Sequence, residues 1–155
     1  MAYATNTSVS VDKSRAEIER MLRRYGADQF TYGCDDSRGM SVIQFRAHER
    51  MIRFVLHLPK MSDYRLTPTK MLRSATQTEK VWEQACRSRW RALYLCIHAK
   101  LEAVDSDISE FEDEFLAHIV LPDGKTASEW LRPQIALCYQ SDRMPTSLLA
   151  LPAPE

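Results

Sequence analysis

The sequence predicts an α+β domain in which amphipathic helices cover one face of a three-stranded antiparallel sheet. Apolar residues recur every three or four positions over 77–104, and residues 29–58 instead follow a period of two. A shorter helical pattern precedes the strands. The predicted order is an N-terminal helix, a three-stranded meander, a long amphipathic helix and two shorter C-terminal helices.

The 155 residues fit one domain with its own core. We expect a flexible tail over 1–10, a single domain over 11–142 and a Pro-rich tail over 143–155. The chain has no run of about 18 apolar residues and no secretory signal pattern, so we expect neither membrane insertion nor secretion. The four cysteines lack metal-ligand spacing and indicate reduced thiols in a cytoplasm; they are Cys34, Cys86, Cys96 and Cys138.

The first helix has two alternative start signals. Ser14 and Glu17 have the spacing of a capping box, although Asp12 could cap instead, and Gly26 is a suitable C-terminal cap. Three strands follow, with Phe30, Tyr32 and Cys34 on one side of the first. A turn at His48 and Glu49 joins the second and third strands. Their apolar face comprises Ile43, Phe45, Ala47, Ile52, Phe54, Leu56 and Leu58, and the opposite face carries Gln44, Arg46, Arg53 and His57.

Residues 59–76 show no clear period, and a segment of this length inside a domain is typically functional or disordered. The long helix after it carries two faces. Its apolar stripe comprises Trp82, Cys86, Trp90, Leu93, Ile97, Leu101 and Val104, and the opposite face includes Arg87, Arg91, Tyr94 and His98.

The C-terminal third contains two further capping-box spacings, Ser109 with Glu112 and Thr126 with Glu129. The first predicts a short helix with Phe111, Phe115 and Ile119 inward and an acidic first turn. The second predicts a last helix, which Pro133 should break or restart.

Charge is distributed unevenly although the formal net charge is zero. Residues 60–100 hold 9 Lys and Arg against 3 Asp and Glu, whereas residues 101–155 hold 3 against 11. This asymmetry indicates either a polyanion-binding region beside an acidic one or two halves that neutralise each other in the fold.

No catalytic motif stands out in the chain, so a non-enzymatic protein without cofactor or metal is the preferred interpretation. Glu114 and His118 lie four residues apart on one helical face, but two ligands without a third do not make a metal site. A cysteine nucleophile, Cys86 or Cys96 with His98, lacks any recognisable surrounding motif, and core packing explains these residues better.

Three stretches resemble an uncharacterised protein family encoded by bacteriophages and prophages: VDKSRAEIERMLRRYGADQF, RWRALYLCIHAKLEAV and FEDEFLAHIVLPDGKTASEWLRPQI. The resemblance covers roughly residues 9–148. It implies a protein made in the bacterial cytoplasm and transfers no catalytic residue, because the family has no established activity. The layout of a helix, a meander and a long basic helix is also similar to the core of Rad52-like single-strand annealing proteins.

We therefore predict a non-enzymatic phage accessory protein in DNA metabolism that binds single-stranded nucleic acid. The predicted contacts are Arg46, Arg53, Tyr64, Arg65, Lys70, Arg73, Arg87, Arg91 and Tyr94. The alternative is a host-takeover or anti-defence protein that binds a host protein through Glu110, Glu112, Asp113 and Glu114. A homo-oligomer paired through the opposite-sign segments fits either role. The first prediction requires that the acidic segment does not cover the basic face of the long helix.

Overall fold

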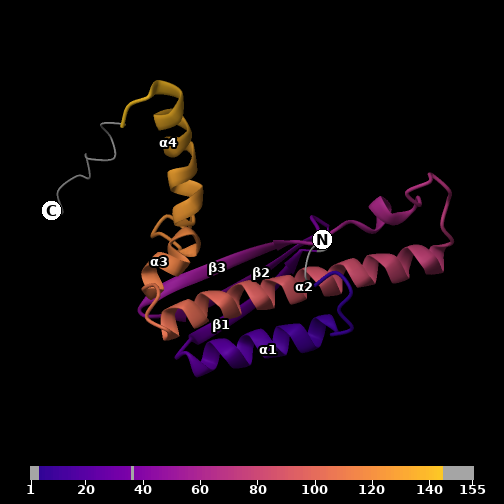
Figure 1. Ribbon diagram of the computed structural model, residues 1–155, viewed down its shortest axis with the longest axis horizontal. Coiled ribbons are helices and arrows are strands. Elements are labelled where there is room, and N and C mark those ends of the chain that lie inside the picture. Colours follow the sequence, from indigo (N-terminus) through magenta and orange to yellow (C-terminus); the bar gives the residue numbers. More distant parts are fainter. Residues whose placement is uncertain (1–3, 36, 145–155) are drawn as a thin grey trace.

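The computed structural model describes residues 4–35 and 37–144. It confirms the predicted α+β class and element order (Figure 1). The elements are α1 (Val11–Arg24), β1 (Asp28–Asp35), β2 (Met40–Ala47), β3 (Arg50–His57), the 3-10 turn η1 (Met61–Tyr64), α2 (Ala75–Asp105), α3 (Phe111–Phe115), the 3-10 turn η2 (Leu116–His118) and α4 (Ala127–Ser141).

The sheet is a meander in the order β1-β2-β3, with both pairs antiparallel. The tight turn predicted between β2 and β3 is confirmed, since His48 and Glu49 both have positive φ, at 49° and 61°. At the other end of β2, Gly39 has a φ of 62°, and a Cβ there would lie 3.1 Å from the Leu58 carbonyl oxygen. Any other residue would be strained at this position, so glycine is favoured where the chain enters β2.

One face of the sheet is buried under α1 and α2, which lie side by side (Figure 1). Ile43, Phe45, Ile52 and Phe54 are buried, and residues on either side of each are more exposed, as the period of two predicts. The helices contribute Ile18, Met21 and Leu22 from α1, with Trp90, Leu93, Ile97 and Leu101 from α2. The opposite face carries Gln44, Arg46, Arg53 and His57, as the alternation indicates.

Helix α1 begins before either predicted cap. The Ser10 hydroxyl accepts a hydrogen bond from the Lys13 backbone N–H, so Ser10 is the N-cap. Ser14 is instead a fully buried residue of the helix interior. Residues 4–10 of the predicted flexible tail contact the fold, because the Gln84 side chain donates to the Thr5 and Thr7 carbonyls at 3.1 and 2.9 Å.

Helix α2 is much longer than the sheet beneath it. Its 31 residues span about 46 Å at the usual rise, whereas an eight-residue strand spans roughly 27 Å. It starts at a capping box formed by Ser74 and Gln77. The N-terminal part of α2 therefore extends past the sheet.

Helix α3 and η2 close the core at the C-terminal end of α2. Phe111 and Phe115 are buried as predicted, and Phe115 packs edge-on against Phe45 and Phe54. The predicted Ser109 cap is wrong, because Glu110 occupies the N-cap and makes no side-chain capping bond.

Helix α4 confirms one prediction and contradicts another. Thr126 and Glu129 form the predicted capping box. Pro133, however, lies inside the continuous helix Ala127–Ser141. A proline at this position leaves the carbonyl four residues earlier without its helical donor, and both Glu129 and Pro133 are exposed, so water can satisfy that carbonyl. The predicted C-terminal tail lies largely outside the described residues.

Candidate nucleic-acid interface

Residues 59–74, which connect β3 to α2, form an ordered hairpin. We call this segment the basic hairpin. After η1, an antiparallel bridge joins Leu66 to Leu72, and the Thr67 N–H donates to the Met71 carbonyl at 2.8 Å. The turn between them contains Lys70, whose φ is 61°. The period-free segment thus has regular hydrogen bonding of its own.

Two side chains fasten the basic hairpin to itself and to α2. The Arg73 guanidinium donates to the carbonyls of Tyr64 and Leu66, at 2.8 and 2.6 Å. The Trp82 indole N–H, half-buried on α2, donates to the Pro59 carbonyl at 2.7 Å. Arg73, predicted to contact nucleic acid, is therefore engaged in holding the hairpin in shape.

The other cations of the basic hairpin have no acidic partner. No ion pair among the described residues includes Lys60, Arg65 or Lys70. The acid in this segment, Asp63, accepts a hydrogen bond from its neighbour Ser62. The positive N-terminal end of the α2 dipole lies directly after Ser74 and adds to the same potential. The hairpin is consequently a region of uncompensated positive charge.

A hollow of about 310 Å³ lies between the basic hairpin and the first turns of α2. Met61, Leu72, Ala75 and Thr78 form its mainly apolar walls, with the Arg65 and Arg73 side chains also lining it. Leu72 and Met71 are 76% and 68% exposed, respectively, although both are apolar. A flat apolar group flanked by negative charge would match this combination of walls and cations.

Two predicted contacts lie elsewhere, on the open face of the sheet. Arg46 makes two hydrogen bonds to Asp28, at 2.8 and 2.6 Å, and this pairing lowers the pKa of the Asp28 carboxyl. Arg53 donates to the Gln44 side chain and to the Gly124 carbonyl. Both guanidiniums therefore already have partners within the chain.

Three further predicted contacts lie on α2 where it faces α1. Arg91 forms an ion pair with Glu17 of α1 and stacks on the Tyr94 ring, with its guanidinium carbon 4.1 Å from the ring centroid. Arg87 bonds to the Gln84 side chain. Arg87 also pairs with Glu83, one turn earlier on α2, at 3.8 Å. The carboxylates on this face therefore come from α1 and from α2 itself, and not from the acidic C-terminal segment. The nine predicted contacts thus fall into three groups. Two lie on the open face of the sheet, three on α2, and Tyr64, Arg65, Lys70 and Arg73 in the basic hairpin.

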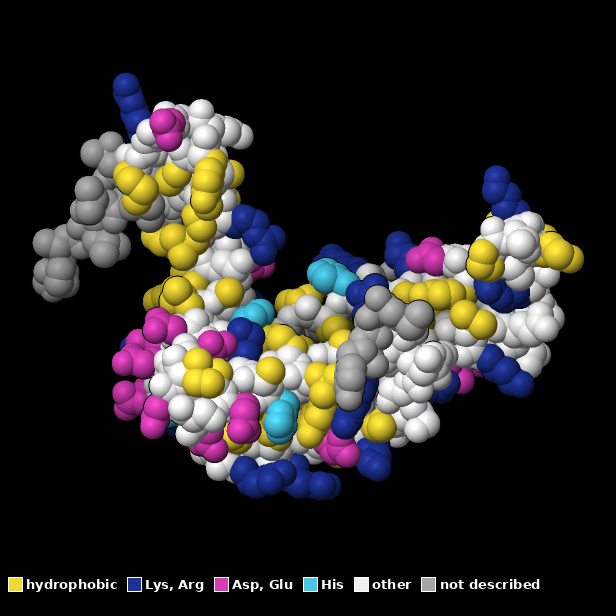
Figure 2. Space-filling model, viewed as in Figure 1, with side chains coloured by type: hydrophobic (Ala, Val, Ile, Leu, Met, Phe, Trp, Pro, Cys, Tyr) yellow, Lys and Arg dark blue, Asp and Glu magenta, His cyan; other side chains and the backbone are white. Residues whose placement is uncertain are grey.

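The predicted acidic residues divide into paired and unpaired groups. Glu112 pairs with Arg50 at 2.9 Å, and Glu114 pairs with Lys100 at 3.5 Å. Glu110 and Asp113 are exposed and take part in none of the ion pairs found in the described chain. Figure 2 shows acidic side chains gathered over α3 and the C-terminal end of α2.

Sequence reasoning missed part of the hairpin site. The cations of the segment, Lys60 included, are recognisable in the sequence as backbone-contacting residues, but the apolar hollow formed by Met61 and Leu72 is not. The available signal was the presence of Met61, Leu66, Met71 and Leu72 in a segment without a period that could bury them.

No group of three or more His, Cys, Asp or Glu side chains within residues 4–35 and 37–144 could hold a metal ion. His118 is half-buried and stacked on Phe54, with ring centroids 4.0 Å apart. Burial, with Lys100 nearby, lowers its pKa from the ordinary value of 6.5. Burial raises the pKa of the Cys86 thiol, which makes that thiol less reactive.

In the part of the chain that the structure describes, no helix is both long and apolar enough to cross a membrane. Comparison of the chain with protein-family models, with curated proteins and with solved structures finds no match.

Proposed function

We propose that this protein is a non-enzymatic accessory protein in phage DNA metabolism that binds single-stranded nucleic acid through its basic hairpin. The observation that carries the proposal is the apolar hollow beside cations that have no carboxylate partner. Phosphates would be neutralised by Lys60, Arg65 and Lys70, and a base would lie against Met61 and Leu72. The resemblance to phage-encoded proteins supports a bacterial cytoplasmic setting.

The arrangement favours a single strand over a duplex. A base enters a hollow of this kind only when it is not stacked and paired in a double helix. Tyr64 is half-buried in η1, next in sequence to Arg65, and its ring does not line the hollow. Arg73 donates hydrogen bonds to the Tyr64 and Leu66 carbonyls, so its main role in this proposal is to fix the shape of the hairpin and not to neutralise a phosphate.

Fluorescence anisotropy with labelled oligonucleotides tests the proposal. We expect salt-dependent binding that is strongly weakened by Arg65→Ala with Lys70→Ala. Each lost phosphate contact should reduce the slope of log affinity against log salt by about 0.7. The matched control is Arg20→Ala with Arg24→Ala, which removes two exposed, unpaired cations from α1 and should leave binding nearly unchanged.

Leu72→Ser provides a second arm, because it removes an exposed apolar wall of the hollow without altering charge. It should weaken binding without changing the salt slope. Absence of binding at low salt would reject the proposal. Equal losses in the hairpin and α1 variants would also reject it, since they would indicate attraction to net charge alone.

We propose as a second candidate that the acidic surface around α3 binds a basic host protein. Its support is that Glu110 and Asp113 are exposed and unpaired, with Asp107 exposed beside them. The pairs made by Glu112 and Glu114 help hold α3, so reversing those charges would confound the test. Pull-down from host lysate should retain a defined protein that Glu110→Lys with Asp113→Lys no longer retains. If the variant still retains the same protein, the acidic surface is not its binding site.

A further inference from the structure

Helix α4 presents a broad uncharged face that the rest of the described chain leaves largely uncovered. Only Ala127, in its first turn, is buried, where its N–H donates to the Ile119 carbonyl. Trp130, Ile135, Leu137 and Tyr139 are 41%, 48%, 58% and 87% exposed. Figure 1 shows α4 standing away from α2 and the sheet, and Figure 2 shows hydrophobic side chains along it.

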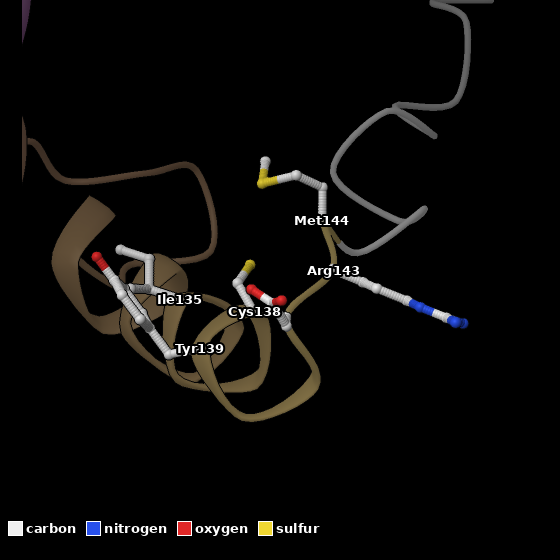
Figure 3. A pocket seen from close by; sticks show the side chains of 6 residues that line it. Ile135, Cys138, Tyr139, Arg143 and Met144 are labelled. Carbon is white, nitrogen blue, oxygen red and sulfur yellow. The ribbon is translucent and has the colours of Figure 1, made fainter.

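Helical spacing places these residues on one face. At 3.6 residues per turn, an arc of about 200° runs from Leu137 through Trp130, Leu131 and Ile135 to Tyr139 and contains no charged residue. Figure 3 shows the C-terminal part of this face, with Ile135, Cys138 and Tyr139 projecting from the helix and Arg143 directed away. Leu131, Arg132 and Ile135 line a hollow with Lys100, Glu114 and Leu116, so α4 has neighbours in the described chain only over its N-terminal half. A 15-residue helix with so few contacts is marginal in water without a partner along this face.

We propose that α4 pairs with α4 of a second copy of this chain, antiparallel, about a two-fold axis. The exposed parts of the four large apolar side chains amount to roughly 500 Å² per chain, at the upper end for a monomer. With Leu116 and the polar rim, the face approaches the roughly 800 Å² per partner of a stable interface. The exposed area of this face of α4 is thus comparable to the area that each chain buries in a dimer interface.

The border of the face indicates why the partner is a second copy. Arg132 and Tyr139 lie two turns apart on the same edge, and both are exposed. An antiparallel pair centred between Ile135 and Ala136 places Arg132 of one chain level with Tyr139 of the other, and this contact occurs twice. A guanidinium over a tyrosine ring is attractive, and the uncharged arc brings no like charges together. The surface is therefore complementary to itself.

Light scattering on the full chain tests this inference independently of nucleic-acid binding. We expect a mass twice the 17.9 kDa of one chain, and we expect it to persist in about 1 M salt, which screens charge pairs. Ile135→Lys should convert the dimer to a monomer, and Tyr139→Ala should raise its dissociation constant. Ala136→Lys is the matched control, because Ala136 is exposed on the opposite side of α4 and should leave the dimer intact.

Circular dichroism of each variant confirms that the fold is retained, since all three positions are exposed. A wild-type chain that remains monomeric at its highest soluble concentration would overturn the inference, because the face would then serve another occupant. A dimer that survives Ile135→Lys, or that dissociates in high salt, would overturn it as well.

Discussion

Helices α1 and α4 are nearly equal in length, 14 and 15 residues, and each begins at a side-chain cap. Their surroundings differ sharply. Helix α1 lies along α2 and buries Ile18, Met21 and Leu22 almost completely. Helix α4 buries only Ala127 and leaves its large apolar side chains exposed. Capping and helix propensity are therefore insufficient to say how firmly a helix of this size is held.

The difference follows from what each helix has beside it. Arg91 of α2 pairs with Glu17 of α1, and Tyr25 at the end of α1 donates to Asp105 at 3.1 Å. These bonds add to continuous apolar packing along α1. Beyond its first turn, α4 has no comparable neighbour in the described chain. We expect α1 to unfold with the core and α4 to open locally.

The largest expected effect separates two tryptophans. Trp90 is 1% exposed between α2 and the sheet, and Trp130 is 41% exposed on α4. Trp90→Ala should lower the free energy of unfolding by about 3–5 kcal/mol through cavity formation. Trp130→Ala, measured under dilute conditions, should lower it by less than about 1 kcal/mol. Denaturant unfolding measures both, and similar losses would mean that α4 belongs to the core.

A smaller effect separates the two helix caps. Ser10→Ala removes the α1 cap and Thr126→Ala removes the α4 cap, each at a cost of about 1 kcal/mol to its own helix. Because α1 is part of the core, Ser10→Ala should reduce global stability. Thr126→Ala should instead increase hydrogen exchange in α4 and leave the global value nearly unchanged. Loss of protection across the whole chain in Thr126→Ala would contradict the local opening of α4.

The smallest expected effect is a pH dependence at the junction of the core with the α4 region. The folded state lowers the pKa of His118 below its ordinary value of 6.5, so the unfolded chain binds the proton first as pH falls. Stability should therefore decline below about pH 6.5 and level off below the folded-state pKa. His118→Gln should flatten this slope, and the exposed His98→Gln should retain it. Equal slopes in wild type and His118→Gln would show that His118 is not responsible.

Much of the fold could be predicted because its signals are local periods. Apolar residues at every second position predict which side chains of the strands face the core. Apolar residues at every third or fourth position predict the buried stripe of α2, in which Trp90, Leu93 and Ile97 are indeed buried. The start of α1 was wrong because Ser10, Asp12 and Ser14 are all good caps, and only packing selects among them. Pro133 was misjudged because its cost depends on whether the freed carbonyl reaches water.

The candidate site was less predictable because it depends on which cations find partners. Nothing in the sequence distinguishes Arg46 and Arg91 from Arg65. In the fold, however, Arg46 forms an ion pair with Asp28 and Arg91 forms one with Glu17, and both partners are distant in sequence. Long-range pairing of this kind has no local signature. Arg73 likewise could not be recognised as a brace before the hairpin carbonyls that accept its hydrogen bonds were located.

The overhang of α2 beyond the sheet makes this helix a lever. Its C-terminal half is clamped between α1 and the strands, and its free end carries the basic hairpin (Figure 1). If α2 stays straight, a small tilt of its packed C-terminal half displaces its N-terminal end, and the basic hairpin there, by a larger distance. Because α4 stands at the far end of the same helix, whatever docks there leaves the hairpin unobstructed. If two chains pair through α4, both basic hairpins would therefore stay clear of the interface.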